Sequence, residues 1–126
     1  MQYKYKIEFL KNDKGFSESE EYIFELIQKS KKSKDARIKI NKIIEYLDAL
    51  EKFGVTVGQP AVKHINGELY ELRPLRDRFF FFYQYENRYI VLNHFVKKTQ
   101  KTPQKEIDKA LRLIEYYNRK ENNDGK

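Results

Sequence analysis

Hydrophobic residues recur along this chain with two different spacings, and each spacing predicts a type of secondary structure. Alternation and short apolar runs predict five strands, over residues 3–10, 62–65, 69–73, 78–85 and 89–96. The last two are nearly continuous apolar runs, which favour central strands buried on both faces. The Asn66-Gly67 pair is typical of a type I′ hairpin turn, because that turn needs positive φ at both central residues.

Apolar residues spaced three and four positions apart predict a hairpin of two helices after the first strand. Ser17 and Glu20 form the two ends of a capping box, so a first helix is expected over residues 18–31. A second helix is expected from Asp35 until Gly54 ends it in the C′ position. Its apolar face is expected to contain Ile40, Ile43, Ile44, Leu47, Leu50 and Phe53. We expect this hairpin to cover one face of the sheet.

A third helix is expected after the last strand, with Thr102 as its N-cap and Pro103 at its first position. The polar residues 121–126 are expected to form a frayed tail. The whole pattern predicts one α+β domain over residues 1–120. Its mostly antiparallel sheet, of about four or five strands, is covered by the N-terminal helical hairpin and the C-terminal helix.

Composition adds a charge bias to this fold. The 126 residues include 26 Lys and Arg against 19 Asp and Glu, which gives a net charge of +7. Residues 60–101 alone carry 8 basic and 4 acidic side chains, so more than half of the excess lies in the sheet region. A basic excess indicates a polyanionic partner such as nucleic acid, although a surplus that only aids solubility stays open.

Several classes of site are excluded or disfavoured by the residues that the chain lacks. The absence of cysteine excludes disulfides and thiolate metal sites, and it suits a reducing cytoplasm. No secretory signal or membrane-spanning run is found. The sequence also has no glycine-rich phosphate loop, no histidine pair at metal spacing and no carboxylate cluster in the sheet region. We therefore expect a cytoplasmic protein that uses no cofactor and no metal.

Cleavage of RNA without a metal ion is compatible with this composition, because the 2′-hydroxyl beside the scissile phosphate serves as the nucleophile. The protein then has to stabilise the charge on the phosphate oxygens and to assist two proton transfers. Arginine suits the first task, since its planar fork pairs two oxygens at once. Arg73, Arg76 and Arg78 flank a single turn between two predicted strands, where they can converge.

Two stretches of the chain resemble a known family. LYELRPLRDRFFFFY at residues 69–83 and IVLNHFVKKTQKTPQKEIDKA at residues 90–110 are similar to RelE/HigB-type toxins of bacterial type II toxin–antitoxin modules, in the phage-derived HigB branch. The resemblance implies a RelE-like fold and a ribosome-dependent, metal-independent mRNA endoribonuclease that inhibits translation. It also implies neutralisation by a cognate antitoxin, a HigA-like helix-turn-helix protein, in a toxin–antitoxin heterotetramer.

The same resemblance implies roles for individual residues. Arg73 and Arg78 match positions that stabilise the transition-state phosphate, and His94 matches a candidate for proton transfer. Contacts with the RNA backbone are implied for Arg76, Lys97, Lys98 and Lys101. Alternation along the last strand places His94 on the same face as Ile90 and Leu92, so a buried structural histidine stays open as the alternative.

Two other functions stay open at this point. The same superfamily includes ParE-like proteins, which poison DNA gyrase through a protein contact and cleave no RNA. A non-catalytic RNA- or ribosome-binding protein would use the same arginines only as electrostatic anchors. The basic residues after the last strand favour the ribonuclease over the gyrase poison.

Overall fold

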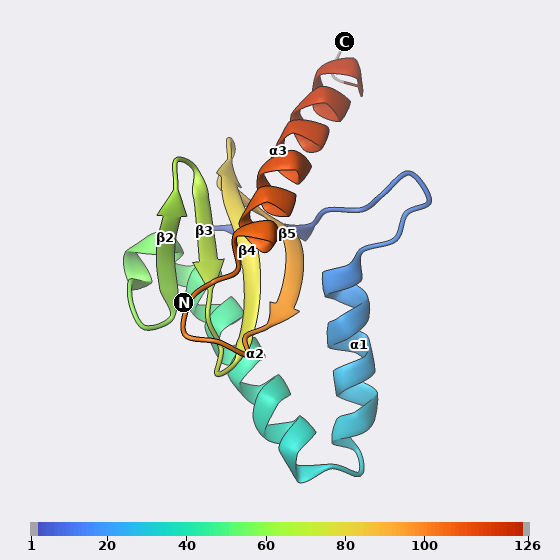
Figure 1. Cartoon of the computed structure of the whole chain (residues 1–126), viewed down its shortest axis with the longest axis vertical. Coiled ribbons are helices and arrows are strands. Elements are labelled where there is room, and N and C mark those ends of the chain that lie inside the picture. The colour runs from blue at the N-terminus through green and yellow to red at the C-terminus, as the bar shows by residue number, and fades with distance from the viewer. Residues whose placement is uncertain (1–2, 125–126) are drawn as a thin grey trace.

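Residues 3–124, the part of the chain that the computed structural model describes, form a five-stranded sheet with helices on both faces (Figure 1). The elements in chain order are β1 (Lys6–Phe9), α1 (Glu18–Ser30), α2 (Lys34–Phe53), the 3₁₀ turn η1 (Gly54–Val57), β2 (Val62–Asn66), β3 (Leu69–Leu72), β4 (Asp77–Gln84), β5 (Arg88–Val96) and α3 (Gln104–Asp124). The strand order is β1-β5-β4-β3-β2, in which β1 runs parallel to β5 and the other neighbours are antiparallel. The predicted α+β class is confirmed.

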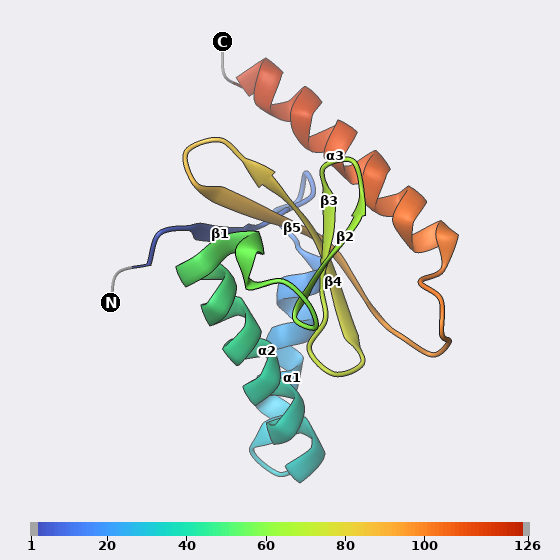
Figure 2. The ribbon, with the colours of Figure 1, turned by 90° about the vertical axis from the view of Figure 1, so that its left-hand side faces the viewer.

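The sheet lies between two helical layers, as the side view in Figure 2 shows. The α1–α2 hairpin covers one face and α3 covers the other. Phe79 and Phe81 of the central strand β4 pack under the hairpin, while Phe80 and Phe82 pack under α3. All four side chains are at most 1 % exposed. The prediction of a strand buried on both faces is confirmed, because successive side chains of one strand reach opposite faces.

Polar caps fix where the two hairpin helices begin. The Ser17 hydroxyl accepts a hydrogen bond from the Glu20 amide at 3.2 Å, as predicted for the first helix. The Ser33 hydroxyl accepts one from the Ala36 amide, also at 3.2 Å, at the start of α2. Each cap satisfies an amide that has no partner in the first helical turn.

The second helix ends where predicted, but the prediction of its buried apolar face is wrong at two positions. Gly54 follows α2 with a φ of 66°, a conformation that glycine adopts without strain. Ile44 and Phe53 belong to the predicted apolar face, yet they are 54 % and 50 % exposed. Helical spacing gives the direction of a side chain, and it does not say how far the surface that covers the helix extends.

The turns of the β-hairpins also differ from the prediction. The turn between β2 and β3 has positive φ only at Gly67 (54°), so the prediction of a type I′ turn at Asn66-Gly67 is wrong. Asn66 is the last residue of β2 and pairs with Leu69, which moves the turn one residue along the chain. Two successive positive φ angles occur instead between β4 and β5, at Glu86 (64°) and Asn87 (58°). The strand register therefore decides the turn geometry here.

A bulge in β5 reverses the alternation on which the prediction for His94 rests. The pairing of β4 with β5 shifts by one residue in the middle of the sheet, so β5 contains one extra residue there. His94 lies opposite Phe79 on the hairpin face, whereas Ile90 and Leu92 pack under α3. The predicted face of His94 is wrong because a strict period of two residues does not continue through a bulge.

The C-terminal helix is longer than predicted. α3 continues through Asp124, so residues 121–124 of the expected frayed tail are helical, and residues 125–126 lie outside the described part. The Tyr117 hydroxyl donates a hydrogen bond to the Glu121 carboxylate at 3.2 Å within this last segment. Within residues 3–124, no helix is both long enough and apolar enough to cross a membrane.

Candidate functional site

Two of the predicted arginines meet at a buried carboxylate near the start of β4. Glu71 on β3 is fully buried, and its Oε1 atom lies 3.4 Å from Arg73 Nε and 4.0 Å from Arg78 Nε. The other oxygen, Oε2, accepts a hydrogen bond from the Thr102 hydroxyl at 3.3 Å. Glu71 and Arg73 share a face because they are two residues apart in an extended segment, and Arg78 reaches that face from the neighbouring strand. One carboxylate thus forms ion pairs with two guanidinium groups, although Glu71 Oε1, Arg73 Nε and Arg78 Nε have no hydrogen-bond partner among the residues that the structure describes.

Arg78 is also fixed by the backbone of the turn before β4. Its Nη1 atom donates to the carbonyl oxygens of Leu75 at 2.7 Å and of Asp77 at 2.9 Å. Leu75 itself has a φ of 57°, which is uncommon for a bulky residue. These contacts orient the Arg78 guanidinium before any ligand binds, and such pre-organisation lowers the cost of binding.

The connection from β5 to α3, residues 97–103, passes over this cluster, and we call it the arch. At its start the Lys97 amide donates to the Arg76 carbonyl at 2.8 Å, and near its end Thr102 contacts Glu71. The arch can be followed in Figure 1 from the end of β5 to the start of α3. Beside it lies a pocket of about 360 Å³, the arginine pocket, lined by Leu75, Arg76, Arg78, Lys97, Lys98, Thr99 and Gln100.

The site carries more positive than negative charge. Burial lowers the pKa of the Arg78 guanidinium, and repulsion from Arg73 adds to this effect. The pKa of the Lys97 ammonium is also lowered, first by burial and then by Arg78 and Arg73. Glu71 opposes both shifts without cancelling them. Because these cations repel one another, an anion placed among them is stabilised by all of them.

His94 belongs to a different network, on the opposite face of the sheet. Its Nε2 atom lies 2.9 Å from Asp77 Oδ1, which also accepts a hydrogen bond from the Tyr22 hydroxyl at 2.6 Å. The rings of His94 and Tyr22 stack with centroids 3.8 Å apart, and Lys39 Nζ lies 3.8 Å from Asp77 Oδ2. Burial acts to raise the pKa of the Asp77 carboxyl, but the bonds from His94 and Tyr22 outweigh it, so the pKa lies below its usual value. The network joins both hairpin helices to the start of β4.

The structure brings six of the seven predicted site residues to the arch and separates the seventh. Those near the arch are Arg73, Arg76, Arg78, Lys97, Lys98 and Lys101. His94 instead contacts Asp77 under the helical hairpin. Among residues 3–124, no three His, Asp or Glu side chains gather in a way that could hold a metal ion.

Sequence reasoning missed the acidic and hydroxyl groups that organise the cations. The signal for Glu71 is its place two residues before Arg73, which puts a carboxylate on the same face of a mainly apolar strand. Thr102 is predicted as the N-cap of α3 with Pro103 at the first helical position, but α3 begins at Gln104 and the Thr102 hydroxyl donates to Glu71, so that prediction is wrong. The sequence holds no local signal for this contact, since the two residues are 31 positions apart.

The mixed sheet between two helical layers, with a basic site at one end of its central strands, defines an α+β protein with a RelE-like fold. The chain belongs to the family described as Phage derived protein Gp49-like (DUF891), which matches residues 29–115. This family is RelE-like and toxin-like. The matched range contains all of α2, the strands β2 to β5 and the arch, and hence every predicted site residue. No curated protein matches the chain.

Proposed function

We propose that the protein is the toxin of a type II toxin–antitoxin module, in the HigB-like branch, and that it cleaves mRNA on the ribosome without a metal ion. The observation that carries the proposal is the pairing of Arg73 and Arg78 on the buried Glu71, beside a pocket lined by further cations. Membership of a toxin-like family supports the biological role. We further propose that it acts in the cytoplasm and that a HigA-like antitoxin neutralises it.

The cluster fits the charge that develops during cleavage of RNA. The 2′-hydroxyl gives its proton to water as its oxygen forms a bond to the adjacent phosphorus; the bond to the 5′-oxygen breaks, that oxygen takes up a proton, and negative charge builds on the non-bridging oxygens in between. Arg73 and Arg78 supply donors for these oxygens; backbone carbonyls orient Arg78, and both guanidinium groups are ion-paired with Glu71. Donors that are oriented in advance stabilise the transition state without reorganising at the moment of reaction.

Proton transfer to the leaving 5′-oxygen needs an acid near the arginines. Lys97 meets this need, because its lowered pKa makes its ammonium group a stronger acid than that of an ordinary lysine. We assign His94 a positioning role in place of proton transfer, since it holds Asp77 at the start of β4, next to Arg78. The exposed Arg76, Lys98 and Lys101 then contact the RNA backbone.

The test is primer extension across a translated reporter mRNA after brief expression of the wild-type chain and of three variants. New 5′ ends inside the translated region are expected with the wild type and with Lys32→Ala, which alters an exposed lysine between α1 and α2. Arg73→Ala is expected to lower cleavage by about 10²- to 10³-fold, the loss typical of removing one donor to a transition-state oxyanion. Arg73→Lys keeps the charge but loses the planar fork, so an intermediate loss is expected.

Thermal denaturation of each variant shows whether the fold is retained, and Arg73→Lys carries the test if Arg73→Ala does not fold. Growth arrest with intact message would overturn the nuclease. Induction of the DNA-damage response would then favour a gyrase poison, and blocked translation without DNA damage would favour a non-catalytic ribosome binder.

A further inference from the structure

A second basic pocket lies on the other side of the arch. It measures about 260 Å³ and is lined by Lys63, His64, Ile65, Lys97, Gln100, Lys101, Thr102 and Ile107; we call it the lysine pocket. Lys97 and Gln100 line both this pocket and the arginine pocket. The two pockets are therefore neighbours that share one wall, and the arch passes between them.

Cations reach the lysine pocket from two separate parts of the chain. Lys63 belongs to β2 and lies opposite Glu71 in the sheet register, while Lys101 belongs to the arch. Lys63 is among the cations that lower the pKa of Lys97, so the charges of the two pockets act on each other through the shared wall. The residues that line the two pockets, all within the described part of the chain, include no Asp or Glu.

The two lysines of the second pocket are free to meet a ligand. Lys63 and Lys101 are exposed, and within residues 3–124 neither forms an ion pair. Some other lysines do contact carboxylates, as Lys52 does with Asp48 at 2.9 Å and Lys109 with Glu18 at 3.1 Å. Unpaired cations that line a concave surface attract an anion more strongly than paired ones on a convex surface.

We propose that single-stranded RNA lies across the arch, with one backbone phosphate in the arginine pocket and a neighbouring phosphate in the lysine pocket. This inference rests on the proposed function, because it takes the arginine pocket as the place of the scissile phosphate. Gln100 borders both pockets, and its amide can donate to and accept from the RNA between them. The smallest ligand that uses the whole site is an oligonucleotide, since a mononucleotide fills only one pocket.

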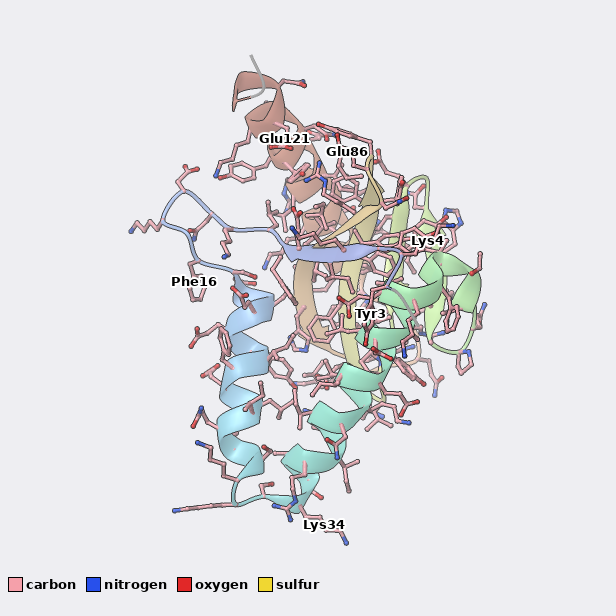
Figure 3. All side chains as sticks on the ribbon, turned by 180° about the vertical axis from the view of Figure 1, so that it is seen from behind. Tyr3, Lys4, Phe16, Lys34, Glu86 and Glu121 are labelled. Atoms are coloured by element: carbon pink, nitrogen blue, oxygen red, sulfur yellow. The ribbon has the colours of Figure 1, made fainter. Side chains whose placement is uncertain are left out.

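The test measures equilibrium binding of 2′-O-methyl RNA, which cannot be cleaved, to the full chain by fluorescence anisotropy at several salt concentrations. The ligands are a mononucleotide, a dinucleotide and a hexanucleotide. The test variant combines Lys63→Ala with Lys101→Ala. The control combines Lys32→Ala with Lys34→Ala, which removes the same charge at the far tip of the helical hairpin, where Figure 3 labels Lys34. Circular dichroism confirms that each variant is folded.

The test variant is expected to bind the hexanucleotide roughly 5- to 30-fold more weakly, because one or two phosphates are then no longer neutralised by a lysine. Its plot of log affinity against log salt should become shallower by about 0.7 for each such phosphate. Mononucleotide binding should stay unchanged, and the control should bind all ligands like the wild type. An equal loss of affinity for the mononucleotide and the hexanucleotide would overturn the inference. Hexanucleotide binding that is unchanged in the test variant would also overturn it.

The outcome is independent of the nuclease assay, because the ligand cannot be cleaved. Message cleavage together with unchanged hexanucleotide binding in the test variant would remove only the two-pocket inference. Intact message together with the expected length-dependent loss would remove the nuclease and leave an RNA-binding protein with two phosphate pockets.

Discussion

Gly54 closes the end of α2 against two tyrosine side chains. A Cβ added at this position would lie 2.8 Å from both Tyr5 Cε2 and the Tyr89 hydroxyl oxygen. The Val55 amide donates to the same Tyr89 hydroxyl at 3.1 Å, so that side chain cannot withdraw without losing a hydrogen bond. The positive φ of 66° adds backbone strain for any residue that has a Cβ. Only glycine fits both the conformation and the space.

Gly54→Ala is therefore expected to lower the free energy of unfolding by about 2–4 kcal/mol, because backbone strain and overpacking each cost on the order of 1–3 kcal/mol. Gly15→Ala is the matched control, since Gly15 has a φ of 79° but no atom within 4 Å of an added Cβ. The control should show the strain alone, about 1 kcal/mol. Urea denaturation measures both values, and equal losses would contradict the role given to the tyrosine contacts.

For individual residues, the sequence predicts which charged side chains lie at the site better than it predicts the contacts that hold those side chains. Arg73 and Arg78 are predictable from their place beside one turn. Their shared partner Glu71 is visible only as a carboxylate on the correct face, and its burial depends on packing that a local pattern does not contain. The contact between Thr102 and Glu71 joins residues whose separation in sequence gives no periodic signal.

Among the elements, the start of β4 depends on its contact with the helical hairpin. Asp77 has a lowered pKa, so its carboxylate stabilises the fold above its unfolded pKa of about 3.9, and this stabilisation is lost as pH falls through the lower folded value. Asp77→Asn is expected to lower the free energy of unfolding at neutral pH by about 1–3 kcal/mol, because it removes charged hydrogen bonds. The difference from the wild type should shrink as pH falls below about 4.

Urea denaturation between neutral and strongly acidic pH measures this dependence. Tyr22→Phe removes one donor to Asp77 and keeps the aromatic ring against His94, so its effect should be smaller and should follow the same pH trend. A constant difference between wild type and Asp77→Asn at every pH would show that the charge of Asp77 does not contribute.

The helices and strands are largely predictable from the sequence. Hydrophobic spacing extends over many residues, so one residue that departs from the pattern does not change the type of element predicted. All three helices and all five strands lie where the pattern predicts them, with ends that shift by a few residues. The bulge in β5 is the exception. One extra residue moves His94 to the hairpin face, and no residue type in β5 marks that insertion.

For the whole molecule, the sheet separates two cores, and the strands β3, β4 and β5 each contribute buried side chains to both. Phe80 packs under α3 beside Phe95, and Phe81 packs under the hairpin beside Tyr89. Although Phe80 and Phe81 are neighbours in sequence, their side chains have no partners in common among these aromatic pairs. Substitutions usually add in free energy at distant sites without shared partners, and here the two side chains are kept apart by the sheet and joined only through the backbone of β4.

Phe80→Leu and Phe81→Leu are each expected to lower the free energy of unfolding by about 1–3 kcal/mol. The double variant should lose the sum of the two to within about 0.5 kcal/mol. A double-mutant cycle by urea denaturation gives the coupling directly. A coupling of about 1 kcal/mol or more would mean that the backbone of β4 transmits strain from one core to the other.

The arch lies late in the sequence, so it is synthesised after the strands that carry the arginines. Glu71, Arg73 and Arg78 precede residues 97–103 in the sequence, so they are synthesised before the segment that lines both pockets. Thr102, whose hydroxyl donates to the Glu71 carboxylate, comes 31 positions after Glu71. Under the proposed function, the protein would therefore bind RNA only after residues 97–103 have been synthesised, and the ribosome that makes it would not be a target before that point.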